Sequence, residues 1–298
     1  MIQEIQNLFG PVYGWILAMG IAVSLSCAVL GSFLVVRKMS LIGDAISHAV
    51  LPGLAIAFLF SGSRATIPML LGAIAMGMTT SFLIEFVSQK SFIKKDAATG
   101  IVFTSLFAIG VILISLFADK IDLDQECVLY GEITFIPLEP HFYLGNLDLG
   151  PYPFVIMSGV CLVVVLVVIL FYKELVLTSF DPALALSLGV PVTFIHYLLM
   201  GLVSTTIVSA FESVGAILVV AMLIAPAATA YLLTNRFSKM LLLASLFAVL
   251  NTFFGLYFAI RLDASVAGGI AVAGFAFFLL AFLFSPSQGL VSRAIKRA

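Results

Sequence analysis

The sequence has few charged residues. Only 10% of its 298 residues are Asp, Glu, Lys or Arg, whereas 62% are hydrophobic and the mean hydropathy is +1.23. Water-soluble domains carry roughly 25% charged residues, because their surfaces face water. A deficit of this size excludes a soluble globular protein and indicates that much of the surface contacts lipid. We therefore expect a polytopic membrane protein.

Cysteine is also scarce, and the motifs of several protein classes are missing. The three cysteines, Cys27, Cys127 and Cys161, form no Cys-x-x-Cys pair, so neither a thiolate metal cage nor a disulfide framework is expected. The sequence contains no Gly-x-x-x-x-Gly-Lys-Ser/Thr loop, and no soluble segment is long enough to hold a nucleotide-binding fold. The chain therefore cannot hydrolyse ATP by itself. We expect neither enzyme activity nor a nucleic-acid partner.

Apolar runs dominate the sequence, and a run of about 20 residues is long enough to cross the hydrocarbon core of a bilayer. Eight runs are clear. A ninth, at 42–60, is interrupted by Pro52-Gly53, which is compatible with a full span, a broken helix or a re-entrant element. We expect an all-α fold with eight, possibly nine, transmembrane helices in a single permease domain over residues 1–298. The eight clear runs are 12–36, 65–88, 97–118, 152–172, 193–211, 213–234, 240–260 and 264–284.

The basic residues predict the orientation of these spans. Lys and Arg concentrate in alternate connections and at the C-terminus, and such ends face the cytoplasm under the positive-inside rule. The connection at 119–148 instead carries seven carboxylates and a single lysine, so we expect it to face outward. The basic residues on the cytoplasmic side are Arg37, Lys38, Lys90, Lys94, Lys95, Lys173, Arg236, Lys239, Arg293, Lys296 and Arg297.

Asp44 and His48 lie four residues apart in the interrupted run. At helical spacing their side chains stack on one face, one turn apart. A carboxylate oxygen and an imidazole nitrogen are both ligands for divalent transition metals, and ionisable groups inside apolar segments are usually functional. Alternatively, Asp44 caps a helix near the cytoplasmic surface and His48 bonds to a backbone carbonyl. The residues alone leave both interpretations open.

A short capped helix is predicted at about 181–189. Asp181 suits the N-cap, Pro182 suits the first helical position, and Gly189 can adopt the left-handed conformation after the last turn. Such a helix, with small residues such as Ala183 and Ala185, can dock into a groove on a partner. It can equally be a well-terminated turn at the membrane surface.

Three further polar residues lie near the ends of spans. Glu212 falls at an outer junction, where it can guide a cation into a pore, cap the next helix or face lipid headgroups. Glu85 lies near the inner end of its span and can pair with Lys90. His196 begins a span and is interpreted as a packing or interfacial histidine. We expect no transport role for Glu85 or His196.

Four separated motifs together resemble those of the ABC-type permeases for manganese, zinc and iron. They are the segment around Asp44 and His48, the loop 122–132, the short helix ending at Gly189, and the stretch from Glu212 to the sequence Ala225-Pro226-Ala227-Ala228. The motifs occur in the family's order and cover nearly the whole chain. The resemblance is specific for the family but does not distinguish the metal.

This resemblance implies the membrane subunit of an ATP-binding cassette importer in the bacterial cytoplasmic (inner) membrane. The family's permeases are usually described with about eight membrane helices and work as two-fold dimers, whose second subunit is an identical copy or a close paralogue. Asp44 and His48 would line the pore at the dimer axis and bind the transported manganese, zinc or iron ion, with no permanently bound cofactor. A cytosolic ATP-binding subunit would couple through Asp181, Ala185 and Gly189, and an extracytoplasmic metal-binding protein would deliver the metal past a pore entrance near Glu212.

Two other classes compete with this interpretation. An ion- or proton-coupled secondary metal transporter needs no ATPase, but it is expected to carry further buried carboxylates for the coupling ion, and few are present. In a scaffold or assembly factor that does not transport, the Asp44/His48 pair would be incidental.

Overall fold

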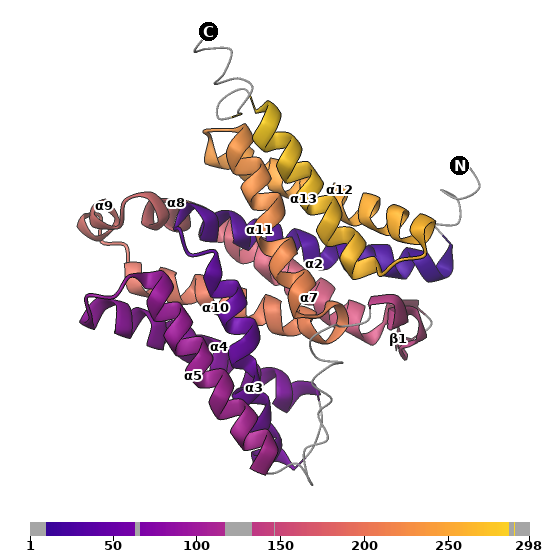
Figure 1. Ribbon diagram of the computed structural model, residues 1–298, viewed down its shortest axis with the longest axis horizontal. Coiled ribbons are helices and arrows are strands. Elements are labelled where there is room, and N and C mark those ends of the chain that lie inside the picture. Colours follow the sequence, from indigo (N-terminus) through magenta and orange to yellow (C-terminus); the bar gives the residue numbers. More distant parts are fainter. Residues whose placement is uncertain (1–9, 63–65, 117–132, 146, 286–288, 290–298) are drawn as a thin grey trace.

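The computed structural model describes residues 10–62, 66–116, 133–145, 147–285 and 289, and its architecture is a bundle of long helices (Figure 1). Within these residues, nine helices are long and apolar enough to cross a membrane. They coincide with the eight clear apolar runs and the interrupted run at 42–60, so the all-α polytopic fold is confirmed. The nine helices are α2 (Pro11–Val36), α3 (Leu41–Ser61), α4 (Thr66–Lys90), α5 (Lys95–Leu116), α7 (Tyr152–Leu170), α10 (Val192–Val214), α11 (Ala216–Leu233), α12 (Phe237–Leu262) and α13 (Val266–Phe284).

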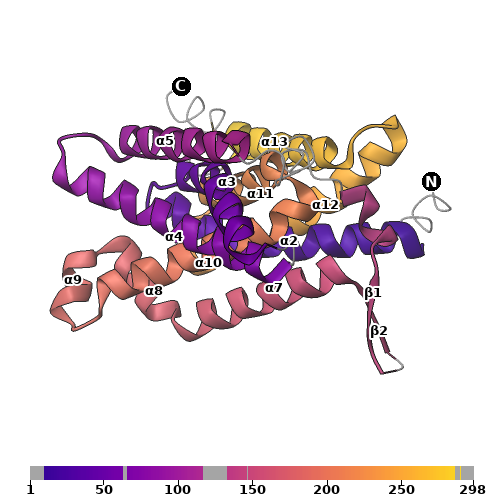
Figure 2. The same cartoon turned by 90° about the horizontal axis from the view of Figure 1, so that it is seen from below.

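Short elements occupy the two ends of the bundle. A hairpin of two antiparallel strands, which the sequence did not predict, precedes α7, and two short helices follow it. Figures 1 and 2 both place this hairpin and α9 at opposite ends of the bundle. Residues 117–132, which include the predicted loop motif and most of the acidic connection, lie outside the described residues. The short elements are η1 (Ile133–Leu138), β1 (His141–Leu144), β2 (Leu147–Pro151), α8 (Tyr172–Phe180) and α9 (Pro182–Ser187).

Helix α2 is the central helix of the bundle. Several of its large side chains, among them Met19, Leu30 and Phe33, are completely buried, and it packs against α7, α10, α11 and α12. Helix α7, by contrast, exposes large apolar side chains such as Leu166 and Ile169. Exposed leucine and isoleucine on a span of this composition are explained by contact with lipid.

Helix α3 is continuous through Pro52. It runs for 21 residues, from Leu41 to Ser61, and at 1.5 Å per residue it is about 31 Å long, enough to cross a hydrocarbon core of about 30 Å. Proline has no backbone N–H, so the usual helical hydrogen bond to the carbonyl of His48 is absent. The helix is therefore not broken at the Pro52-Gly53 interruption, and packing must offset the missing bond.

That packing comes from close contacts with the neighbouring helices α4 and α5. A Cβ atom on Gly53 would lie 2.7 Å from the carbonyl oxygen of Gly72 in α4, and a Cβ atom on Gly110 of α5 would lie 2.7 Å from Cδ of Pro52. Membrane helices approach each other this closely where glycine exposes the backbone, since van der Waals packing drives their association. The Pro52-Gly53 pair therefore fits α3 directly against α4 and α5.

Replacing Gly53 with alanine tests this packing. We expect Gly53→Ala to destabilise the protein by about 1–3 kcal/mol, the usual cost of overpacking, because the backbone of α4 must move. The midpoint of thermal unfolding in detergent measures the effect. Gly159→Ala in α7 is the matched control: its Cβ would meet no atom within 4 Å, so the midpoint should be unchanged or slightly higher. Equal midpoints for Gly53→Ala and the parent would contradict the proposed fit.

Candidate metal site

Asp44 and His48 occupy the first turns of α3 and face the same way. His48 Nε2 lies 3.5 Å from Asp44 Oδ1, and the side chains are 32% and 44% exposed, respectively. Most of the neighbouring residues are buried, including Gly43, Ala45 and Ser47. The two potential ligands therefore lie on the one face of this part of α3 that the chain leaves partly open.

Exposure on this face decreases along the helix. Asp44 is more exposed than His48, and the next residues on the same face, Leu51 and Ala55, are buried against α5. His48 lies about 10 Å along the axis from Leu41 at 1.5 Å per residue. The pair is thus closest to the end of α3 that follows α2, and apolar packing closes the face beyond it.

Two phenylalanines of α5 hold the imidazole of His48. Phe103 stacks on the ring with a centroid separation of 5.8 Å, and Phe107 meets it edge-on at 5.9 Å. Aromatic contacts of this kind restrict the orientation of a ring and exclude water from its faces. The ring edge that carries Nε2 faces Asp44. This arrangement holds an imidazole nitrogen within 3.5 Å of a carboxylate oxygen.

A single chain supplies too few ligands for a closed metal site. No group of three or more His, Cys, Asp or Glu side chains that could hold a metal ion occurs within the described part of the chain. Structural and catalytic transition-metal sites use three or four protein ligands. The Asp44/His48 pair is therefore incomplete in one copy of the chain.

The segment predicted to dock on a partner contains the short helix α9. Asp181 Oδ1 accepts a hydrogen bond from the backbone N–H of Leu184 (3.0 Å), and Gly189 has a φ of +78° after the last turn. Ala185, however, is fully buried, so it seats α9 against the rest of the chain. The surface of α9 and its flanks is instead formed by the exposed side chains of Phe180, Leu184, Leu186 and Leu188.

Of the remaining polar candidates, Glu85 and His196 lie together, and Glu212 lies on another part of α10. Glu212 lies in the last turn of α10, and its side chain is outside the described part of the structure. Glu85 pairs with Lys95 at 3.3 Å, whereas the sequence suggested Lys90. His196 Nε2 lies 3.9 Å from the same carboxylate. Glu85 and His196 are far apart in sequence, so no local spacing could reveal their contact.

On the hairpin, His141 is already engaged. Its Nδ1 lies 2.8 Å from Asp148 Oδ2, and its ring meets Trp15 edge-on at 5.8 Å. The hydrogen bond from His141, together with one from the backbone N–H of Gly150, lowers the pKa of Asp148. His141 therefore anchors the hairpin to α2 and is separate from the Asp44/His48 pair.

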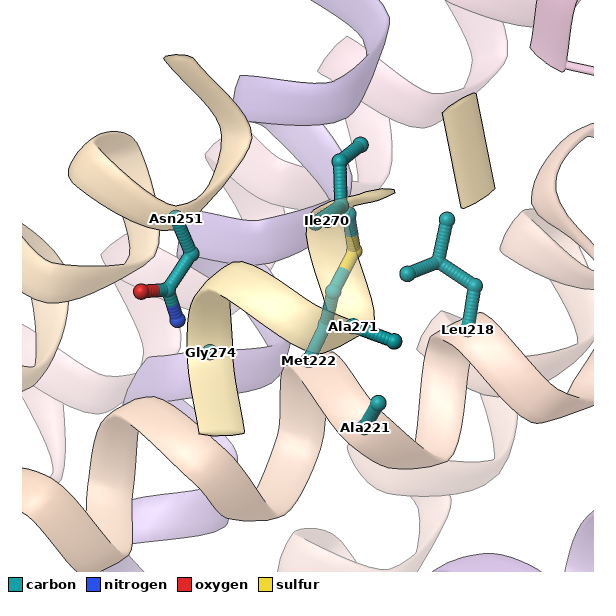
Figure 3. Close-up of a pocket in the computed structure, with 7 residues that line it drawn as sticks. All are labelled: Leu218, Ala221, Met222, Asn251, Ile270, Ala271 and Gly274. Atoms are coloured by element: carbon teal, nitrogen blue, oxygen red, sulfur yellow. The ribbon is translucent and has the colours of Figure 1, made fainter. Parts of the chain in front are cut away.

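A small cavity between α11, α12 and α13 is also separate from this pair (Figure 3). Its volume of about 10 Å³ is close to the minimum for one water molecule. Asn251 lines it, and its buried Oδ1 has no hydrogen-bond partner among the described residues. The residues around the cavity offer no ligand set for a metal, because apart from Asn251 the lining is apolar or glycine. The other lining residues are Leu218, Ala221, Met222, Ile270, Ala271 and Gly274.

The chain is similar to known proteins along almost its whole length. The model of the ABC 3 transport family matches residues 12–285. The chain is 45% identical over 282 residues to the manganese transport system membrane protein MntD of Bacillus subtilis (strain 168), covering 95% of both chains. It is 41% identical over 281 residues to the zinc transport system membrane protein TroD of Treponema pallidum (strain Nichols), covering 94% of this chain and 76% of that protein.

Among solved structures, the fold is similar to PsaBC from Streptococcus pneumoniae in complex with Fab. The TM-score is 0.79 at 36% sequence identity, and the match covers 100% of this chain and 99% of the other. The resemblance to manganese, zinc and iron permeases, first indicated by four short motifs, is therefore confirmed. The chain is a multi-pass membrane protein that belongs to the ABC 3 transport family.

Proposed function

We propose that this chain is the permease subunit of an ATP-driven importer that moves a divalent transition metal, Mn²⁺, Zn²⁺ or Fe²⁺, into the bacterial cytoplasm. The observation that carries this proposal is the Asp44/His48 pair, which is partly open on an otherwise well-packed part of α3. Relatives named for manganese and for zinc transport support the same class of cargo.

A second copy of the chain, or a close relative, completes the metal site. A two-fold axis beside the open face of α3 brings a second Asp44 and a second His48 to the first pair. Two oxygens and two nitrogens suit the three candidate metals. Two carboxylates also neutralise a divalent ion, which lowers the cost of holding its charge within an apolar bundle.

Such a site favours conduction over storage. A transport site must bind the ion strongly enough to accept it and weakly enough to release it. A thiolate cage would retain zinc tightly, whereas carboxylate and imidazole ligands from two subunits can separate when the subunits move. The metal is therefore cargo, and the permease needs no permanently bound cofactor.

The two ends of the bundle serve different partners in this proposal. A separate cytosolic ATPase docks on α9, where exposed leucines surround the buried Ala185. An extracytoplasmic metal-binding protein delivers the ion at the opposite end, beside the hairpin. The basic residues Arg37 and Lys95 lie toward the α9 end. Arg37 donates a hydrogen bond to Ser179 of α8 and also contacts His196, and His196 lies beside the carboxylate of Glu85 with which Lys95 pairs. This placement supports a cytoplasmic α9.

Replacing the ligands tests the metal site. Asp44→Ala and His48→Ala should each reduce uptake of Mn²⁺ and Zn²⁺ by at least about tenfold, since losing even an outer-shell partner of a ligand costs about 10- to 100-fold in affinity or activity. Uptake is measured in proteoliposomes that contain the permease, its ATPase and ATP. Asp96→Ala removes an exposed carboxylate at the start of α5 and should transport normally.

The same proteoliposomes distinguish the classes of transporter. Uptake that requires both the ATPase and ATP supports the importer, whereas uptake driven by a proton gradient alone would establish a secondary transporter instead. Normal transport of both metals by both ligand variants would refute the proposed site.

Replacing Gly189 tests the coupling segment. Gly189→Val places a β-branched residue at a φ of +78°, which costs about 1–3 kcal/mol of backbone strain and should reshape the end of α9. We expect metal-stimulated ATP hydrolysis and uptake to fall together. The matched control is Gly62→Val, at a φ of +60° after α3, because both glycines have open space around them. If Gly189→Val and Gly62→Val behave alike, α9 has no special role in coupling.

A further inference from the structure

Arg37 links the docking segment to the helix that carries the metal ligands. Its Nε donates a hydrogen bond to Ser179 Oγ, and its Nη2 donates one to Thr178 Oγ1, both at 2.9 Å. Thr178 and Ser179 are in the last turn of α8, directly before the Asp181 cap of α9. Arg37 itself follows α2 and lies seven residues before Asp44. Two hydrogen bonds of Arg37 and the short connection 37–40 therefore link the end of α8, next to α9, to the start of α3.

The other side of the guanidinium contacts α10 and, through His196, a polar cluster on α4 and α5. Arg37 Nη1 lies 3.5 Å from His196 Nδ1 in α10. The opposite nitrogen of that ring lies 3.9 Å from Glu85 Oε2 in α4, and Lys95 Nζ, at the start of α5, lies 3.3 Å from the same oxygen. Gln89 Nε2 donates to Glu85 Oε1 at 2.7 Å. This polar network thus joins α4, α5, α8 and α10 through Arg37.

The network does not form a second metal site. Glu85 and His196 are metal-ligand types, but the ammonium of Lys95 and the guanidinium of Arg37 lie beside them. Two cations on the same pair of groups would repel a third. The contacts instead form a structural brace between helices: the planar guanidinium of Arg37 fixes the direction of several hydrogen bonds at once.

Arg37 remains charged within this brace. Burial lowers its pKa from 12.5 to about 10, so the guanidinium is still protonated at neutral pH. Its hydrogen-bond partners within the described residues are two hydroxyls and an imidazole. Partial burial of a cation among neutral partners costs free energy. Packing alone would not require a charged side chain at this position.

We propose that Arg37 is a positioning residue that transmits movement of α8 and α9 to the start of α3, and through His196 and Glu85 to α4 and α5. This inference rests on the proposed function, since it explains how ATPase movement reaches Asp44 and His48. Movement of α8 would displace Arg37, and the four-residue connection from 37 to 40 would carry that displacement into the turn that bears Asp44.

The test measures coupling separately from folding and metal binding. In the permease assembled with its ATPase, Arg37→Ala should reduce metal stimulation of ATP hydrolysis by about tenfold, within the range of typical coupling energies. Basal ATP hydrolysis and Mn²⁺ affinity should stay unchanged. Arg37→Lys, which keeps the charge but loses the fork of donors, should recover part of the stimulation. Lys173→Ala removes an exposed cation from α8 and should behave like the parent.

A second variant guards against misfolding of Arg37→Ala. Thr178→Val keeps the shape of a buried side chain and removes one acceptor for Arg37, so it should lower the stimulation in the same direction. Normal stimulation in both variants overturns the inference, and so does an equal fall in basal and stimulated rates, which marks a purely structural role. If Asp44→Ala abolishes uptake while Arg37→Ala has no effect, only this inference fails. Normal uptake by both Asp44→Ala and His48→Ala would instead refute the proposed metal site, on which this inference rests.

Discussion

The close fit of α3 against α4 and α5 is the contact on which the candidate site depends. Pro52 removes a helical hydrogen bond, and Gly53 removes a side chain, yet the helix continues because Gly72 and Gly110 let its neighbours approach at backbone distance. The same packing brings Phe103 and Phe107 onto the ring of His48. Without this fit, neither the continuity of α3 nor the direction of its two ligands would be fixed.

The candidate site in one chain is incomplete, and this incompleteness is useful under the proposed function. Two ligands cannot hold a transition metal permanently, whereas four ligands divided between two subunits can form and separate as the subunits move. Partial exposure of Asp44 and His48 leaves room for such a partner. Leu51 and Ala55 are buried on the same face, so under the proposed function the path beyond the pair is closed, as alternating access requires in one of its states.

Polar contacts join several helices at the α9 end, where we propose that a cytosolic ATPase docks. Hydrogen bonds with fixed donor geometry couple the positions of the helices that they join. Arg37, His196 and Glu85 supply such contacts between segments that otherwise meet through apolar side chains. The hairpin at the other end is tied to α2 through His141 and Trp15, so α2 contacts elements at both ends of the bundle.

The sequence by itself determined the spans, the pairing of Asp44 with His48 and the cap at Asp181, because each depends on hydropathy or on spacing within one helix. Only the tertiary structure decided the continuity of α3, the burial of Ala185, the hairpin, and the contact of Arg37 with Ser179, 142 residues away. Such features depend on which helices become neighbours. Local sequence patterns do not determine which helices become neighbours, since a proline or an arginine has the same local preferences whatever helix packs beside it.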